Sequence, residues 1–149
     1  MDSNNNSHIT LDNFWAYHAV VLADQISRYT YNVVKSEAGL NISQWRVLAA
    51  VADKPGRTAA DVAAITPMDK TIVSRAVSSL IEAGLIKKKP TKTDKRRLSL
   101  QTTKDGLEIY KKIASQLNEK LVTSLLVDQE GQDFIETVKK FTEKMSKIL

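Results

Sequence analysis

The hydrophobic pattern of this chain changes period twice, from helical to alternating after Gly84 and back to helical at Thr103. Between these points, residues 85–90 and 97–102 alternate apolar and polar side chains, which is typical of short strands with one solvent-facing side. We therefore expect a β-hairpin inside a chain that is otherwise helical. Its two faces would carry Leu98 and Leu100 on one side, and Arg97, Ser99 and Gln101 on the other.

Two short helices are expected directly before this hairpin. Thr58 followed by Asp61 resembles a capping box, which opens a helix to about Ile65. Pro67 stands where the next helix would begin, a position at which its missing N–H costs nothing, and that helix would run to Ala83. Two short helices joined by a tight turn form a helix-turn-helix, and a hairpin directly behind one is a wing.

Longer amphipathic segments flank this unit. A long helix is expected over residues 11–35, a second helix begins at Ser43, whose hydroxyl would cap it, and helical spacing returns over residues 103–125 and 134–148. One thin winged unit offers these long helices little surface to cover. They pack either on each other within one chain or, as we favour, against a second chain.

The positive charge is concentrated in one part of the sequence. The whole chain has a net charge of +5, whereas residues 66–104 alone carry ten basic side chains against three acidic ones. Each flank sums to −1. A basic segment within a neutral scaffold is the pattern expected of a surface that binds a polyanion such as nucleic acid.

The helix that ends near Ala83 has a polar face with two cations, short hydroxyl side chains and no acid after Asp69. Any surface helix has a polar face, but short side chains also let a helix enter the major groove, which is about 12 Å wide. Arginine can then form paired hydrogen bonds with guanine, and lysine can contact phosphate. The candidate DNA-binding residues on this face are Lys70, Thr71, Ser74, Arg75 and Ser78.

The turn of the hairpin is also strongly basic. An arginine at a hairpin tip suits the minor groove, where narrow A·T-rich steps have the most negative potential, and nearby lysines would contact phosphates. Asp94 lies among these cations, and we expect it to orient a neighbouring guanidinium rather than to serve only as a turn former. The candidate DNA-binding residues of the wing are Lys92, Asp94, Lys95, Arg96 and Arg97.

Several short motifs together resemble those of a known family. They are Ser43–Leu48, Asp61–Ala63, Asp69–Val77, Leu80, Gly84–Ile86, Asp94–Arg96 and Gly106. On these motifs, which span about residues 40–107, and on its length and helix order, the chain resembles the MarR family of transcription regulators. One departure is Thr102, which stands where the family usually has leucine, so packing at the base of the wing is in question.

The resemblance implies a homodimer whose first and last helices interlock. Each subunit would place the third helix of its winged unit in a major groove and its wing in a minor groove. Ser74 and Arg75 match the recognition-helix pair of the family, Asp94 and Arg96 match its wing motif, and Arg96 is the candidate for the minor groove.

These arguments divide the chain into three parts: a disordered tail at residues 1–10, a winged helix-turn-helix DNA-binding domain at residues 38–103, and dimerisation helices at residues 11–37 and 104–149. The expected function is sequence-specific regulation of transcription, as a repressor that binds a pseudo-palindromic double-stranded operator as a homodimer. A protein-interaction module and a sequence-independent nucleic-acid binder are the alternatives.

The family often senses small aromatic acids or other amphipathic molecules between its long helices and its winged unit. A ligand of this kind would release the DNA. The competing interpretation is that the tryptophans belong to an ordinary core and that the histidine forms a structural hydrogen bond. The candidate pocket residues are Trp15, His18, Trp45 and Arg46.

Composition argues against an enzyme. The chain has no cysteine, its two histidines (His8 and His18) lie apart, and it has no glycine-rich phosphate loop, so we expect no cofactor, no metal and no thiol-based sensing. The polar start lacks the features of a secretory signal, and no apolar run approaches the roughly 20 residues of a membrane span. A soluble cytoplasmic protein is expected.

Overall fold

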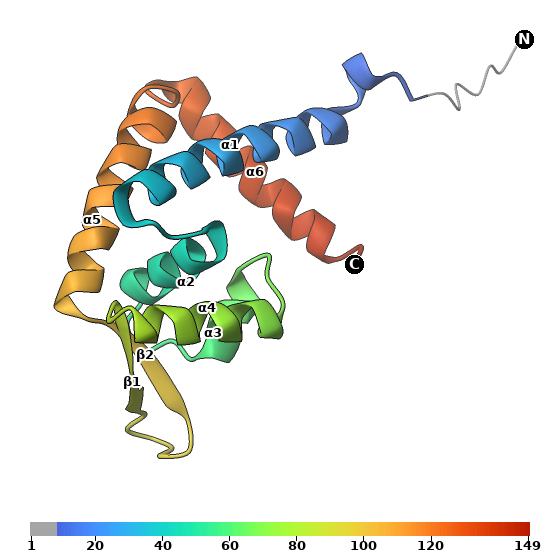
Figure 1. Cartoon of the computed structure of the whole chain (residues 1–149). Coiled ribbons are helices and arrows are strands. Elements are labelled where there is room, and N and C mark those ends of the chain that lie inside the picture. Colours follow the sequence, from blue (N-terminus) through green and yellow to red (C-terminus); the bar gives the residue numbers. More distant parts are fainter. Residues whose placement is uncertain (1–8) are drawn as a thin grey trace, which may run out of the picture.

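The computed structural model describes residues 9–149, a mainly helical fold with a two-stranded antiparallel wing (Figure 1). The predicted fold class, a winged helix-turn-helix with long N- and C-terminal helices, is confirmed. The predicted disordered tail lies outside the described residues except for its last two. The elements are η1 (Leu11–Asn13), α1 (Trp15–Ala38), α2 (Ile42–Asp53), α3 (Ala59–Ile65), α4 (Lys70–Glu82), β1 (Ile86–Pro90), β2 (Leu98–Thr102), α5 (Lys104–Asn118), the π-helical turn η2 (Glu119–Thr123) and α6 (Gln129–Ser146).

The core of the winged unit is formed where α2 packs on α4 and α3 closes one side. The buried face of α4 is the apolar face that its spacing predicts, so the opposite face is left to solvent. Trp45 of α2 stacks on Tyr110 of α5, with ring centroids 5.7 Å apart, and joins this core to the long helices. The buried side chains of the unit include Val47, Leu48, Val51, Val62, Val73, Ala76, Val77 and Leu80.

The caps of the short helices agree with the sequence in one case and differ in two. Thr58 and Asp61 form the predicted capping box of α3, in which hydrogen bonds from Thr58 hold the pKa of the Asp61 carboxyl below its usual range. Ser43 does not cap α2, because Asn41 already has extended backbone and forms a capping box with Gln44.

Pro67 does not begin α4, contrary to the prediction. The chain stays in a turn until Asp69, whose carboxylate accepts a hydrogen bond of 2.8 Å from the backbone N–H of Ile72 and so caps the helix. A carboxylate at this position satisfies one of the free N–H groups of the first turn, which a proline two residues earlier cannot do. Lys70 is therefore the first helical residue of α4.

The wing pairs β1 with β2, with Ile86 opposite Thr102 at its base and Pro90 opposite Leu98 near its tip. The predicted alternation holds only in part. Leu100 is buried as expected, but Leu98 is exposed, because it lies beyond the core at the outer end of the strand. Ser99 is buried, contrary to the prediction of a solvent-facing position, and its hydroxyl donates to the carbonyl oxygen of Lys89.

Thr102 is half-buried and supplies no large apolar side chain at the base of the wing. The base is held by the next residue, Thr103. The Thr103 hydroxyl donates to the carbonyl oxygen of Gly84 at 2.6 Å and accepts from the backbone N–H of Gly106 at 3.1 Å, which caps α5. At Gly106, an added Cβ would lie 1.9 Å from the carbonyl oxygen of Leu85, so only glycine lets α5 begin this close to the wing.

Thr103→Ala removes the cap of α5 and the hydrogen bond to Gly84 together. We expect a loss of about 1–2 kcal/mol in the free energy of unfolding, measured by urea denaturation at fixed protein concentration. Thr102→Ala is the matched control and should cost less, since the Thr102 side chain forms no hydrogen bond within residues 9–149. Equal losses in the two variants would show that Thr103 does not hold the base of the wing.

The long helices begin and end at places that differ from the prediction. A 3-10 turn precedes α1, which then continues to Ala38, and α5 ends at Asn118, where a π-helical turn interrupts the helical spacing. Helix α6 already begins at Gln129, before the helical spacing predicted for residues 134–148, because the Asp128 side chain caps it through the N–H of Gly131.

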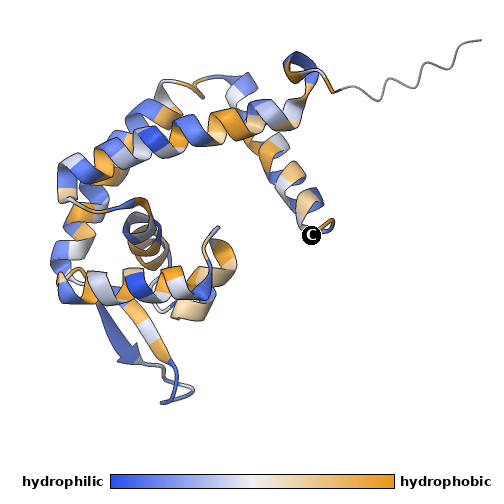
Figure 2. Ribbon diagram, turned by 45° about the vertical axis from the view of Figure 1, so that its right-hand side comes forward, coloured by the Kyte–Doolittle hydropathy of each residue, from blue (hydrophilic) through white to orange (hydrophobic). Residues whose placement is uncertain are grey.

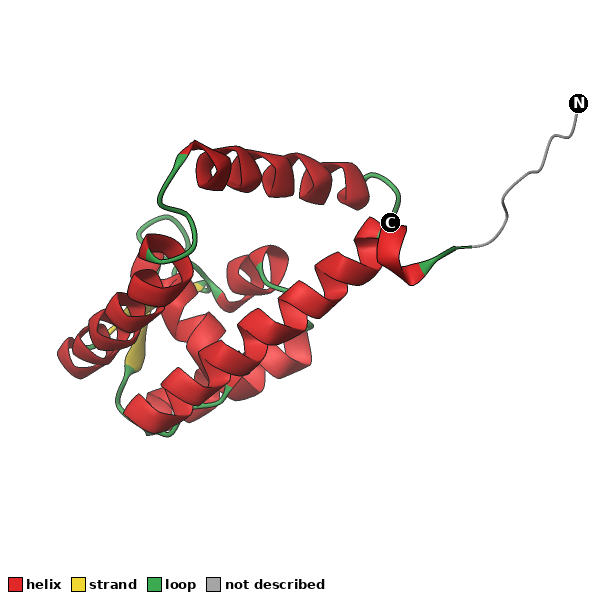
Figure 3. Ribbon diagram, turned by 90° about the horizontal axis from the view of Figure 1, so that it is seen from above, coloured by secondary structure: helices red, strands yellow, loops and turns green. Residues whose placement is uncertain are grey.

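Only part of these long helices is buried within the chain. The C-terminal half of α1 packs on α5 and buries Val33 and Val34, whereas Gly131 is the single buried residue of α6. Apolar segments remain on the N-terminal half of α1 and along α6 (Figure 2). Seen from above, α6 stands apart from the winged unit (Figure 3). Within residues 9–149, no helix combines the length and apolarity that crossing a membrane requires.

Candidate nucleic-acid interface

The outer face of α4 carries all five candidate residues of the predicted recognition helix. They lie opposite the buried face that Val73 and Leu80 form, and each is exposed. None of their side chains forms a hydrogen bond or ion pair within residues 9–149, so their donors are free to bind another molecule. These residues are Lys70, Thr71, Ser74, Arg75 and Ser78.

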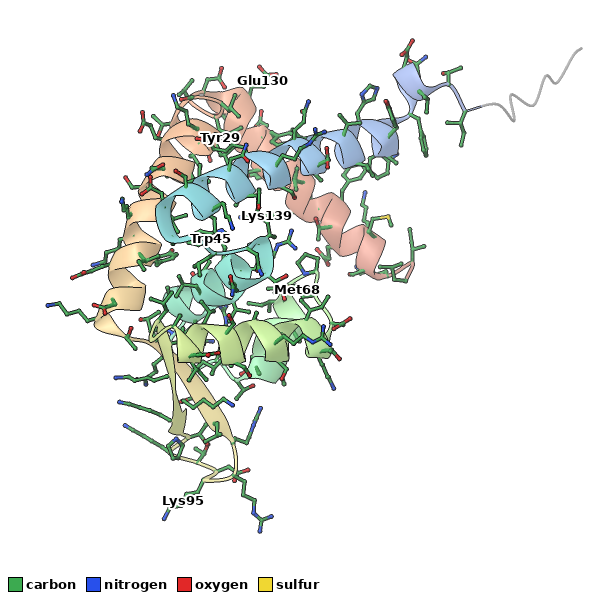
Figure 4. The ribbon with its side chains drawn as sticks, in the orientation of Figure 1. Tyr29, Trp45, Met68, Lys95, Glu130 and Lys139 are labelled. Atoms are coloured by element: carbon green, nitrogen blue, oxygen red, sulfur yellow. The ribbon has the colours of Figure 1, made fainter. Side chains whose placement is uncertain are left out.

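The wing projects beyond α4, with Lys95 at its tip (Figure 4). Its basic candidates Lys92, Lys95, Arg96 and Arg97 are exposed, and in residues 9–149 none of them forms an ion pair. The four ion pairs of the described chain all lie outside residues 66–104. The positive charge of this segment is therefore not neutralised by the protein itself.

Asp94 has a different role from the predicted one. It forms no ion pair with a neighbouring arginine in the described chain, and its Oδ1 accepts a hydrogen bond of 2.9 Å from the backbone N–H of Arg96. The backbone N–H of Asp94 donates to the hydroxyl of Thr91, and its carbonyl oxygen accepts from Thr91 and Arg97. Asp94 is thus a turn former, and it shapes the loop that presents Arg96.

The four candidate pocket residues do not meet in one place. Trp15 and His18 line an open groove of about 810 Å³ between α1 and α6, where Trp15 contacts Phe141 edge-to-face. His18 also has its Nε2 within hydrogen-bond distance, 2.9 Å, of the carbonyl oxygen of Asp12. Trp45 is only 9% exposed and lies in the core, and the half-buried Arg46 is not part of the groove.

The opposite wall of this groove was not predicted as a site. It consists of residues of α6 for which the sequence predicts only helical spacing, over residues 134–148. The signal that they share with α1 is a run of apolar side chains at helical spacing on each helix, but spacing alone does not say that the two runs face each other. The apolar α6 residues of the groove are Phe134, Val138, Phe141 and Met145.

The fold and this unpaired basic surface define a winged helix-turn-helix DNA-binding protein. The MarR family model matches residues 38–97, which cover the winged unit as far as the turn of the wing. A curated relative, the HTH-type transcriptional regulator BilQ of Clostridium symbiosum, is 23% identical over 127 residues, covering 83% of this chain and 88% of the relative.

Solved structures agree over nearly the whole chain. A MarR/EmrR family transcriptional regulator from Acinetobacter sp. ADP1 superposes with a TM-score of 0.78 at 21% identity, covering 95% of this chain and 100% of that one. MarR of Staphylococcus aureus, solved with salicylate and kanamycin, gives a TM-score of 0.70 at 20% identity, covering 86% and 87%. Residues 38–97 match the MarR family of DNA-binding transcriptional regulators, a non-enzymatic family, and the chain has the fold of the solved members.

If Arg96 enters the minor groove, Arg96→Ala should weaken binding most on sites with narrow A·T-rich flanks, by about tenfold, and less on G·C-rich flanks. Fluorescence anisotropy on duplexes that differ only in the flanks measures this difference. Lys95→Ala is the matched control, because Lys95 lies beside Arg96 and should contact phosphate without regard to sequence. An equal loss on both flanks would contradict the minor-groove role.

Proposed function

We propose that the protein is a repressor that binds a pseudo-palindromic operator as a homodimer. Each subunit would place α4 in a major groove and the wing in the adjacent minor groove. The observation that carries the DNA-binding part is the exposed and unpaired basic surface of α4 and the wing. Residues 70–78 of α4 would read base edges, and the wing residues 92–97 would contact the minor groove and phosphates.

The dimer is supported by the apolar surface that a single chain leaves open. In the groove between α1 and α6, Trp15 is 54% exposed, and Phe134, Val138, Phe141 and Met145 are each 42–45% exposed. Monomeric soluble proteins rarely expose a continuous apolar patch of this kind. A second copy of the same two helices would cover it, with residues 11–37 and 104–149 acting as dimerisation helices.

A small amphipathic or aromatic ligand is proposed to release the DNA. The support is twofold: an S. aureus relative was solved with salicylate, and Trp15 and His18 provide an aromatic face and a polar edge in the groove. A ligand lodged there would favour the dimer conformation in which it fits best, and a change in half-site spacing between conformations would alter operator affinity. Titration of the protein–operator complex with salicylate tests this. We expect salicylate to release the wild-type protein from the operator and to leave the Trp15→Ala variant bound.

The experiment that tests the proposed function is selection of bound duplexes from a random pool at a stated salt concentration. Selected sequences should share two inverted half-sites about one helical turn apart, or about 34–36 Å. A sequence without symmetry would contradict the dimer model, and no enrichment at all would indicate sequence-independent binding. A reporter placed downstream of the selected site should be less active when the protein is present, as repression requires.

A further inference from the structure

Two polar contacts flank the turn that joins α1 to α2. On the α1 side, Glu37 pairs with Lys112 of α5, with its carboxylate 2.6 Å from Nζ. The Glu37 side chain is only 19% exposed, although it is charged. Hydrogen bonds from Gln116 and Lys112 hold its pKa below the usual range, so the carboxylate stays ionised and joined to α5.

On the α2 side, both the oxygen and the nitrogen of the Gln44 side-chain amide form hydrogen bonds. Its Oε1 accepts from the backbone N–H of Asn41 at 2.8 Å, and its Nε2 donates to the hydroxyl of Ser79 on α4 at 2.6 Å. Apart from the Glu37 contacts, every other hydrogen bond between two side chains in residues 9–149 joins residues no more than four apart. Gln44 therefore forms a long-range polar link between the N-terminal cap of α2 and helix α4.

The turn between these two contacts has little freedom of its own. Gly39 takes a left-handed conformation with φ of 64°, which ends α1, and Leu40 is buried in the core. Apolar packing supplies the contact area between α2 and α4, but the hydrophobic effect is non-directional and does not by itself select one crossing angle. Hydrogen bonds at fixed atoms set an angle, because they weaken steeply when the donor and acceptor are misaligned.

We propose that Glu37 and Gln44 are positioning residues, which hold α4 at a fixed angle to α1 and α5 and thereby set the half-site spacing that the protein accepts. This inference rests on the proposed function as a dimer on a two-part operator. Neither residue touches DNA in this proposal. Each acts through another residue, Lys112 and Ser79 respectively, so that the dimerisation helices and the recognition helices of the two subunits keep one separation.

The test uses the full chain and a set of duplexes built on the selected operator. The half-sites are separated by the selected spacing or by one or two further base pairs, and a duplex with one half-site is included. Ser79→Ala removes the link but leaves the Asn41–Gln44 capping box, and Glu37→Gln weakens the contact with α5. Ser79→Thr keeps the hydroxyl, and Asp24→Asn breaks an ion pair with Arg28 within one turn of α1. These last two variants are the matched controls.

The wild-type protein should prefer the selected spacing, and Ser79→Ala and Glu37→Gln should each reduce that preference by about threefold or more. The two control variants should keep it. Affinity for the single half-site should stay near the wild-type value in all four variants. Should Ser79→Ala unfold the chain, as thermal melting followed by circular dichroism would show, Glu37→Gln still tests the link from the other side of the turn.

Three outcomes would overturn the proposal. The first is an unchanged spacing preference in both test variants, which leaves the dimeric function intact and removes only the positioning role. The second is a loss on the single half-site as large as that on the full operator, because Ser79 would then contact DNA directly or support the fold. The third is a wild-type protein with no spacing preference, which contradicts the proposed dimeric function as well.

Discussion

Replacing Arg75 by alanine should lower the affinity for the selected operator by about tenfold for each half-site, hence about a hundredfold for a dimer. Arg75 is exposed on α4, its side chain forms no ion pair in residues 9–149, and it lies in the first half of the helix that would enter the groove. A guanidinium can form two parallel hydrogen bonds with guanine, which its replacement by a methyl group removes. The loss should be largest on the selected sequence, measured by anisotropy against a scrambled duplex at the same salt concentration.

Two control variants separate base reading from general attraction to phosphate. Arg75→Lys keeps the charge but not the paired geometry, so it should lose discrimination between the selected and scrambled sites while keeping most of the affinity for scrambled DNA. Lys70→Ala should weaken binding to both duplexes alike and make the salt dependence shallower. If Arg75→Ala weakens both duplexes to the same extent, Arg75 contacts phosphate and does not read a base.

The helical and alternating spacings were sufficient to predict the winged unit. Spacing reports which side chains face a core, and the core of this unit is complete within one chain, so α4 and the hairpin lie close to their predicted positions. The helix starts were less predictable because several residues near each start could cap. Ser43 and Asn41 both can accept the required hydrogen bond, and Asn41 does so because its own backbone, two residues after the left-handed Gly39, is extended.

For a similar reason, the sequence predicted some residues of the candidate site correctly and not others. Exposed cations on one helix face follow from spacing and charge, whereas the role of Asp94 depends on the path of a turn that spacing does not describe. The same holds for the pocket candidates. Trp45 was grouped with Trp15 by residue type, but Trp45 stacks in the core and Trp15 lies in the groove. The link from Gln44 to Ser79 joins residues 35 apart, which no local pattern indicates.

Phe141→Glu should convert the protein to a monomer and reduce operator affinity by about a hundredfold to ten-thousandfold. Phe141 contacts Trp15 with ring centroids 5.1 Å apart, yet 42% of it stays exposed in the single chain, so a second copy would bury the rest. A carboxylate there would have to lose its water at the interface, a cost that a pair with Lys144, whose Nζ lies 5.5 Å from the Phe141 ring, offsets only in part. Each half-site then binds a separate monomer, and the gain in affinity that comes from linking two DNA-binding units in one dimer is lost.

The matched control is Gln132→Glu, which adds the same charge to α6 on the face turned away from the groove. That variant should stay dimeric by light scattering at micromolar concentration and should bind the operator as the wild type does. Phe141→Glu should give a monomeric mass and keep its affinity for a single half-site, because the winged unit has its own core. A dimeric mass for Phe141→Glu would place the subunit interface elsewhere, and loss of single half-site binding would mean that α6 supports the winged unit rather than a second chain.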